Sequence, residues 1–252
     1  SSTGDSVADL EVRTLKAGNL ACLECSVFAV AFGDEILVVD PGGMDSLAEV
    51  QQAIAGVGWD PSRLSRVHFT HLHFDHYRHL EWPESVTTIY VPSMEVSYIS
   101  TLRGLAGDPD RFRALLLESH HQVAPVFLRE FQRVVKGDAY DLRKERRDPR
   151  IREIQDGLRI ADGLEAVSLP GHTVELLGLS VDTSCGTEII CADAVLDETD
   201  SLTPHKRLLS MNPTDEARSR EFVLSFSVVH PGHGASFRPA PRNHPTLEEI
   251  AH

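Results

Sequence analysis

Short apolar runs alternate with turn-forming residues along most of the chain. A run of four to six apolar residues bounded by Gly, Pro or Asp is typical of a buried strand, and Gly33-Asp34 between two such runs is typical of a hairpin. The predicted strands cover residues 10–15, 27–32, 35–39, 67–70, 87–91, 151–154, 158–160, 164–169, 176–181, 188–191 and 228–229. A chain of 252 residues is within the range of one α/β domain, so we expect a single domain over residues 1–252.

Apolar residues recur at helical spacing in other segments. The predicted helices cover residues 47–57, 93–102, about 109–116, about 125–135 and 214–226. Asp108 followed by Pro109 is a favourable helix start, and Phe127 and Phe131 lie on one apolar stripe. No strand is predicted from residue 104 to about 150, so we interpret this part as a helical insertion that ends in a solvated, charged connector.

The chain is acidic, with 38 Asp and Glu residues against 24 Lys and Arg residues and a formal net charge of -14. This negative charge disfavours nucleic acid as a partner, because a phosphate backbone is also negatively charged and repels an acidic protein. No run approaches the roughly 18 apolar residues of a membrane span, and residues 1–5 lack the features of a signal peptide. We therefore expect a soluble, cytoplasmic protein without a membrane partner, and a poorly ordered tail that contains several prolines.

The stretch 70–76, with the sequence THLHFDH, concentrates three His and one Asp in six residues. In extended backbone, residues two apart project to the same side, so His71 and His73 can approach one ion. Asp75 and His76 follow where we predict a helix over 77–81, whose positive end would favour a carboxylate. Imidazoles and a carboxylate at this density after a strand predict a metal site, with ligands enough for two ions.

Three later residues share this context. His172, Asp193 and His233 each follow a predicted strand, and the loops beyond such strands gather ligands in α/β proteins. Together with the first cluster they make five His and two Asp. We therefore expect all seven side chains at one site.

Other histidines and the cysteines are interpreted as structural. His68 and His230 are expected in the core or at a strand edge. His120 and His121 are expected on the exposed surface of the insertion, with a substrate contact as the alternative. The four cysteines, at positions 22, 25, 185 and 191, are too sparse for a disulfide scaffold. The CxxC pair at 22 and 25 lacks a second pair with zinc-ribbon spacing, so we expect small, partly buried strand residues there.

The ordered set of motifs resembles the metallo-β-lactamase superfamily of hydrolases. The motifs are Val39-Asp40-Pro41-Gly42-Gly43, HxHxDH at 71–76, Pro170-Gly171-His172-Thr173, Ala192-Asp193 and Pro231-Gly232-His233-Gly234. They follow the family order over nearly the whole chain. The resemblance implies an α/β fold, the αββα sandwich of two mixed β-sheets flanked by helices, with two metal ions at one edge.

The resemblance also implies a role for each candidate ligand. The first ion would be held by His71, His73 and His172, the second by Asp75, His76 and His233, and both by Asp193 as the bridge, with Asp40 supporting the ligand loop. Asp75 and Asp193 are the expected catalytic residues. We expect two Zn²⁺ per chain, with iron or manganese as alternatives. Two ions about 3.5–4 Å apart can hold a hydroxide nucleophile at neutral pH.

Within the superfamily, the ligand spacing looks most like N-acyl homoserine lactonases and glyoxalase II-type thioesterases. The lactonase pattern has a Tyr where this chain has Leu196, and we do not expect the C-terminal helical domain of the glyoxalase pattern. Asp193 argues against a true β-lactamase, since those enzymes characteristically lack the bridging carboxylate. We expect a hydrolase of a small-molecule ester, lactone or thioester, in which a metal-bridging hydroxide attacks the carbonyl.

The sequence disfavours three other functions. A persulfide dioxygenase-like enzyme would use one iron, which the complete second ligand group disfavours. A ribonuclease Z-like nuclease is disfavoured by the charge of -14. A non-catalytic binding protein is disfavoured because no ligand position is missing.

The helical insertion leaves two interpretations open. Its apolar stripes must be buried, and we expect them against the sandwich or against a second subunit, as in a homodimer. The alternative is that the helices cover the metal edge, where Phe112, Phe127 and Phe131 would line an apolar pocket for an acyl chain.

Overall fold

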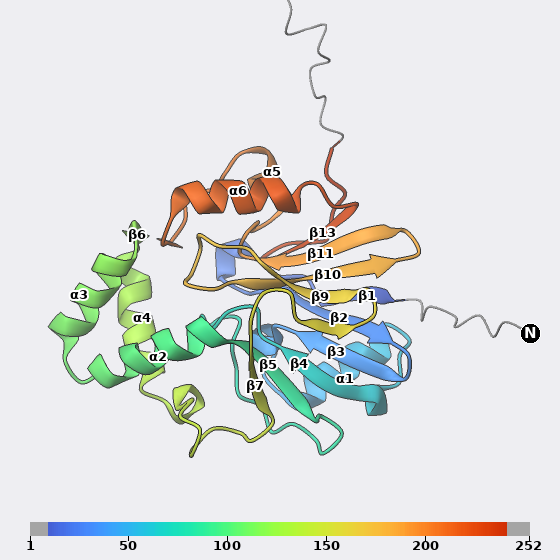
Figure 1. Cartoon of the computed structure of the whole chain (residues 1–252), viewed down its shortest axis with the longest axis horizontal. Helices are drawn as coiled ribbons and strands as arrows, with labels where there is room; N and C mark the ends of the chain where they lie inside the picture. Colours follow the sequence, from blue (N-terminus) through green and yellow to red (C-terminus); the bar gives the residue numbers. More distant parts are fainter. Residues whose placement is uncertain (1–9, 241–252) are drawn as a thin grey trace, which may run out of the picture.

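The computed structural model describes residues 10–240, in which two large β-sheets pack face to face (Figure 1). The first sheet has six strands, in the order β1 (Glu11–Lys16), β2 (Val27–Phe32), β3 (Glu35–Val39), β4 (Leu64–His68), β5 (Thr88–Pro92) and β7 (Ile151–Ile154). The second has five, in the order β13 (Val228–Pro231), β11 (Gly186–Ala192), β10 (Leu177–Thr183), β9 (Leu164–Ser168) and β8 (Arg159–Ala161). Both sheets contain parallel and antiparallel pairs.

Helices cover the outer face of each sheet. α1 (Leu47–Gly56) buries Val50 and Ile54 against the first sheet, and α6 (Pro213–Val223) buries Val223 against the second. Figure 1 shows α6, the second sheet, the first sheet and α1 as successive layers. The predicted αββα sandwich of two mixed sheets is therefore confirmed.

β2 shows why the apolar runs are continuous rather than alternating. Phe28 and Val30 face the core between the sheets, whereas Val27 and Ala29 face the helical side of the first sheet. Because side chains point to opposite faces in turn, a strand covered on both faces must be apolar throughout. All six residues of β2 are buried accordingly.

Residues 104–150, the predicted helical insertion, contain α3 (Pro109–Ser119) and α4 (Pro125–Val135), which lie together with α2 (Ser93–Leu105) at one end of the layers (Figure 1). Asp108 caps α3 by accepting a hydrogen bond from the backbone N–H of Arg111, as its sequence signal predicts. The rings of Phe112 and Phe131 meet between α3 and α4, with centroids 6.5 Å apart. The helices therefore bury much of their apolar surface against one another.

Some predicted elements differ from the structure. No helix begins at Tyr77: the segment between β4 and β5 is irregular, and Tyr77, Leu80 and Trp82 turn into the core from it. The prediction that residues 104–150 contain no strand is wrong, because β6 (Gln122–Val123) pairs with β12 (Leu209–Ser210). β6, β12 and α5 (Glu198–Leu202) are too short to leave a periodic signal.

The cysteine prediction is wrong for the CxxC pair. Cys22 is exposed at the end of the 3₁₀ helix η1 (Leu20–Cys22), and Cys25 is buried in the loop before β2. The other 3₁₀ helices are η2 (Pro41–Gly43), η3 (Pro61–Arg63) and η4 (Asp138–Tyr140). Within residues 10–240 no helix has the length and apolar character needed to cross a bilayer. The predictions for the polar start and for the end of the tail lie outside the described residues.

The core between the sheets gives a direct test of the fold. Leu179 of β10 is fully buried there, so we expect Leu179→Ala to lower the free energy of unfolding by about 2–5 kcal/mol. Leu202 is 74% exposed and is the matched control, so Leu202→Ala should change the free energy of unfolding by no more than about 0.5 kcal/mol. Urea denaturation of both variants measures the difference, and equal midpoints would contradict this packing.

Candidate metal centre

Loops that follow β3, β4, β9, β11 and β13 bring the candidate residues to one edge of the sandwich. β3 and β4 are parallel, as are β11 and β13, so their carboxyl ends meet at the same edge. Two residues leave their strands with left-handed backbone: Asp40 after β3 (φ 50°) and Ala192 at the end of β11 (φ 44°). Such conformations are costly for residues other than Gly and are held by their surroundings, often at functional sites.

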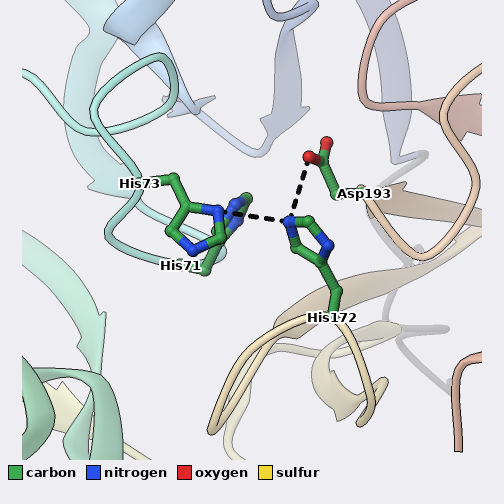
Figure 2. A group of neighbouring side chains, drawn as sticks. All are labelled: His71, His73, His172 and Asp193. Atoms are coloured by element: carbon green, nitrogen blue, oxygen red, sulfur yellow. Dashed lines mark hydrogen bonds and ion pairs between the residues drawn. The ribbon is translucent and has the colours of Figure 1, made fainter. Parts of the chain in front are cut away.

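The first group of ligand atoms comes from His71, His73, His172 and Asp193 (Figure 2). Nε2 of His172 lies 3.1 Å from Nδ1 of His73 and 3.2 Å from Oδ2 of Asp193. All four residues are buried, and their ligand atoms lie within 4.8 Å of one another. The cluster predicted from distant motifs is therefore present.

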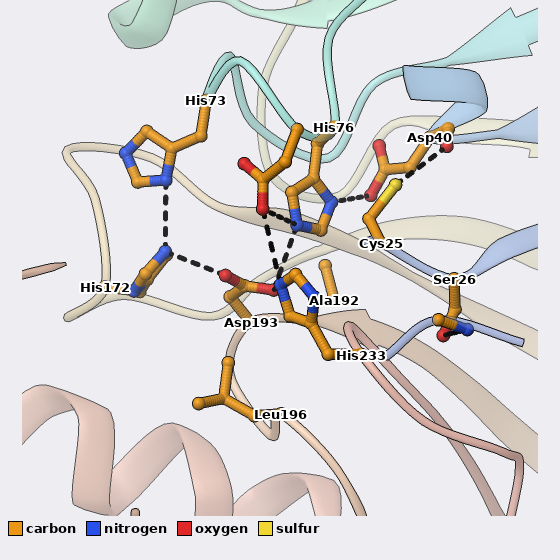
Figure 3. A network of polar contacts seen from close by, with 12 residues as sticks. Cys25, Ser26, Asp40, His73, His76, His172, Ala192, Asp193, Leu196 and His233 are labelled. Atoms are coloured by element: carbon orange, nitrogen blue, oxygen red, sulfur yellow. Dashed lines mark hydrogen bonds and ion pairs between the residues drawn. The ribbon is translucent and has the colours of Figure 1, made fainter. Parts of the chain in front are cut away.

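The second group contains Asp75, His76 and His233. Nε2 of His233 lies 3.4 Å from Oδ2 of Asp75, and Nε2 of His76 lies 3.7 Å from the same oxygen. Oδ1 of Asp193 faces this group as well, at 3.1 Å from Nε2 of His76 and 3.3 Å from Nε2 of His233 (Figure 3). Asp193 thus turns one carboxylate oxygen towards each group.

The outer ring nitrogens of three histidines are held by neighbours. Nδ1 of His76 donates to Asp40 (2.9 Å), and Nδ1 of His233 donates to the carbonyl of Glu24 (2.9 Å). The hydroxyl of Thr70 donates to Asp40, so it accepts the hydrogen bond of His71 Nδ1 at 3.0 Å. Each of these rings, when neutral, therefore presents an unprotonated Nε2 to the site, which is how imidazole binds a metal.

Several inward-facing atoms are buried and unsatisfied by hydrogen bonds within the described chain: Nε2 of His71, Nε2 of His76 and Oδ1 of Asp193. A buried polar atom without a partner costs about 1–3 kcal/mol. Lone pairs that face each other at 3.1 Å also repel unless a proton or a cation lies between them. Imidazole nitrogens and carboxylate oxygens suit Zn²⁺ and related ions, so the residues present fit a divalent metal.

The electrostatics agree with this fit. Burial lowers the pKa of His71 and of His73 well below the ordinary value, and the neighbouring imidazoles lower both further, so these rings are neutral. Burial is the largest influence on His76 and His233 and opposes their charge, but the carboxylates of Asp193 and Asp75 together outweigh it and raise the pKa of both. The carboxylates thus attract positive charge into the second group.

Close backbone approach at Asp193 depends on a glycine. A Cβ placed on Gly232 would overlap Oδ1 of Asp193 and the backbone of Ala192. Only Gly fits at position 232 between the ends of β11 and β13, which explains the first glycine of the Pro-Gly-His-Gly motif in physical terms.

A cavity of about 220 Å³ opens onto the site. His73, Asp75, His172, Asp193 and His233 reach its wall. The rest of the lining is mostly apolar and comes from Leu20, Leu23, Phe74, Phe127, Leu196, Lys206, Arg207, Leu208 and Leu209. The candidate ligands therefore open onto a chamber whose wall is mostly apolar but includes the cationic residues Lys206 and Arg207.

Among the aromatic residues predicted to line a pocket, only Phe127 does so. Its ring lies against His73, with centroids 5.1 Å apart. Phe112 and Phe131 are wrong as pocket residues: both are 1% exposed and belong to the core among the insertion helices. A helical stripe identifies the buried face but not which of its members reaches a cavity.

The other histidines lie outside the two groups. His68 is a core residue that bonds the carbonyl of Leu177, and His230 on the edge strand β13 pairs with Glu188, as predicted. The exposed position predicted for His120 is wrong, because its ring is buried and bonds the carbonyl of Leu116 one turn earlier. Neither His120 nor His121 reaches the cavity wall.

Sequence reasoning missed most of the cavity wall. Leu20 and Leu23 lie in and directly after η1, and residues 206–209 lead into β12; these segments are too short for periodicity, and no signal in the sequence distinguishes them. Arg207 is also buried and pairs with Asp200 at 3.0 Å, so its charge is balanced within the wall.

A family model, the metallo-beta-lactamase superfamily, matches residues 20–233. No curated protein matches the chain. Among solved structures, a metallo-beta-lactamase family protein of Thermus thermophilus superposes with a TM-score of 0.56 at 17% identity, covering 90% of this chain and 75% of that one. AidC, a dizinc quorum-quenching lactonase bound to a product, gives 0.54 at 14% identity and covers 90% and 85%.

TTHA1623 in a di-iron-bound form gives a TM-score of 0.52 at 17% identity and covers 88% of this chain and 94% of that one. At such low identity these likenesses concern the fold. The family match spans most of the chain, and the motifs and the two-sheet sandwich agree with it. This chain belongs to the metallo-beta-lactamase superfamily.

Proposed function

We propose that this protein is a hydrolase that uses two divalent metal ions, zinc first among the candidates, to cleave an ester, lactone or thioester of a small molecule. One observation carries the proposal: the buried carboxylate of Asp193 lies between two groups of histidines and turns one oxygen towards each. A carboxylate in that position is suited to bridging two cations. The solved dizinc structure of AidC, a lactonase of similar fold, supports this choice of reaction.

The proposed ligands divide as the two groups do. His71, His73 and His172 would hold one ion, Asp75, His76 and His233 the other, and Asp193 both. When bound, the ions would polarise the scissile carbonyl as Lewis acids and make water acidic enough to act as the nucleophile near neutral pH. Neighbouring donor atoms lie 3.1 to 3.7 Å apart and surround a common centre.

Asp75 is the candidate proton carrier. Its carboxylate belongs to the second group and also reaches the cavity wall, with 15% of its side chain exposed. A carboxylate placed beside the reacting centre can take a proton from attacking water and pass it to the leaving group. Asp193, at 7% side-chain exposure, is more deeply enclosed and better placed to orient than to exchange protons with solvent.

The cavity wall selects the substrate in this proposal. Leucines and Phe127 exclude water and would contact an apolar chain next to the reacting carbonyl. Leu196 lies beside Asp193 in Figure 3 and adds a further apolar contact there. An apolar acyl ester, lactone or thioester therefore fits better than a polar phosphodiester.

Asp193→Ala tests the bridge. We expect metal content to fall below the wild-type value and turnover to fall at least about a hundredfold. The loss of a residue that only hydrogen-bonds to a metal ligand already lowers activity by about 10- to 100-fold, and the loss of a ligand should lower it more. His230→Ala is the control and should keep its metal, because its nitrogens face Glu188 and Ser236. Elemental analysis and a panel of lactones, thioesters and phosphodiesters provide the measurements.

The outcomes separate the candidate reactions. An Asp193→Ala protein with full metal content and unchanged rate would refute the bridging role. A wild-type protein that carries one iron and consumes oxygen would indicate the dioxygenase-like alternative instead.

The pH dependence follows from the ligand chemistry, since a ligating imidazole must be unprotonated. His76 and His233 have a raised pKa, so they take up protons first as the pH falls, from above the reference value of about 6.5. His71 and His73, with a lowered pKa, follow only at lower pH. Bound metal and activity should therefore decline together as the pH falls in metal-free buffer, and the decline should begin above about pH 6.5. Full metal content and activity well below about pH 5 would contradict the histidine ligation.

Phe127→Ala tests the cavity wall. Burying an aromatic or aliphatic side chain against an apolar partner is worth about 1.5–3 kcal/mol, so kcat/KM for long acyl chains should fall about tenfold or more. Short-chain substrates should lose much less, and metal content should not change. Val126→Ala, on the exposed neighbouring residue, is the control. Equal losses on short and long chains would assign Phe127 a purely structural role.

A further inference from the structure

α2 carries a buried acidic residue at its start. Glu95 lies in the first turn of α2 and is 2% exposed, between the exposed Met94 and the buried Val96. The positive end of the helix favours a carboxylate there, although burial raises the pKa of Glu95 above its ordinary value. A buried carboxylate needs several donors, and Glu95 finds them in two loops of the metal centre.

The first loop follows β4. Oε2 of Glu95 accepts a hydrogen bond from the backbone N–H of Leu72 at 3.1 Å. Leu72 lies between His71 and His73, so this bond fixes the backbone from which both histidines project.

The second loop follows β9 in the other sheet. Oε1 of Glu95 accepts hydrogen bonds from the hydroxyl of Thr173 and from the backbone N–H of Glu175 at 3.3 Å. Glu175 in turn accepts from the backbone N–H of Met94 at 2.7 Å, at the start of α2. The loop that carries His172 is therefore bound to the start of α2 from both directions.

We propose that Glu95 is the positioning residue of the His71, His73 and His172 group. It joins the two ligand loops, which come from different sheets, through one carboxylate that only accepts hydrogen bonds. This inference rests on the proposed metal ligands. Asp40 has the corresponding place at the second group, where it holds His76 and the backbone of Thr70.

A carboxylate is required because two of its three neighbours, the backbone N–H groups of Leu72 and Glu175, can only donate, and each donates to a different oxygen of Glu95. In Glu95→Gln one carboxylate oxygen becomes an NH₂ group, which would face either the N–H of Leu72 or the donors of the second loop. The substitution keeps the shape of the side chain and removes the hydrogen bond to one of the two loops. The effect should therefore be confined to the relative placement of the two loops.

The test compares Glu95→Gln with Glu49→Gln. Glu49 occupies the first turn of α1 and accepts the N–H of Asp45 at 2.7 Å, so the amide oxygen of Gln can keep this bond and the control removes only the charge of a first-turn carboxylate that belongs to neither group of candidate ligands. Thr173→Val, which deletes one donor to Glu95, is a second variant in case Glu95→Gln does not fold.

Two measurements are needed. The first is amide hydrogen exchange in the metal-free protein, where Leu72 or Glu175 should exchange faster in the Glu95 variant and remain unchanged in the control. The second is zinc titration against a chromophoric chelator, where one of two sites should bind about 10- to 100-fold more weakly and the other as in wild type.

The outcomes distinguish this inference from the proposed function. Two wild-type zinc sites that both persist at full affinity in Glu95→Gln and Thr173→Val, or an equal weakening of the two, would overturn the positioning role and leave the proposed function standing. A wild-type chain that binds no metal would overturn the proposed function and this inference with it.

Discussion

The buried carboxylate of Asp193 imposes the strongest constraint on this structure. An isolated charge at 5% exposure would cost several kcal/mol, and its two oxygens face imidazole nitrogens rather than water. The arrangement is favourable only if positive charge, as protons or as metal ions, enters the same space. The fold must therefore hold seven donors from four loops against their mutual repulsion until that charge arrives.

The backbone around the site holds these donors in place through rigid local conformations and close contacts. Ala192 adopts left-handed backbone immediately before Asp193, and Gly232 passes so close to Asp193 that any side chain would displace it. On the first sheet, Asp40 also takes a left-handed conformation and then accepts three hydrogen bonds, from the N–H and hydroxyl of Thr70 and from His76. Conformations that cost energy locally are thus stabilised by the bonds that position the histidines.

The sequence was informative wherever structure is decided locally. The hairpin around Gly33, the doubly buried strands and the capped start of α3 could all be predicted, because composition and short-range chemistry determine them. The seven candidate ligands could be found because they occur in short motifs after strands.

Tertiary contacts decided the rest. The segment at Tyr77 is irregular because its hydroxyl bonds the carbonyl of Ala139, more than sixty positions away, and its ring packs on Phe69. β6 exists only because β12 lies beside it. His120 is buried because the end of α3 supplies a carbonyl for it, and nothing in the sequence marks Glu95 as the link between two loops.

The walls of the cavity and its metal edge have different origins in the chain. The proposed ligands follow β4, β9, β11 and β13 of the sandwich, whereas the apolar wall comes mainly from η1, from α4 and from the segment joined to β12. Phe127 touches His73, but its backbone belongs to a helix that packs on α3, so its side chain can change without moving a strand. Because the two parts are held by different contacts, substitutions in the wall should alter the range of substrates while the sheets continue to hold the proposed ligands in place.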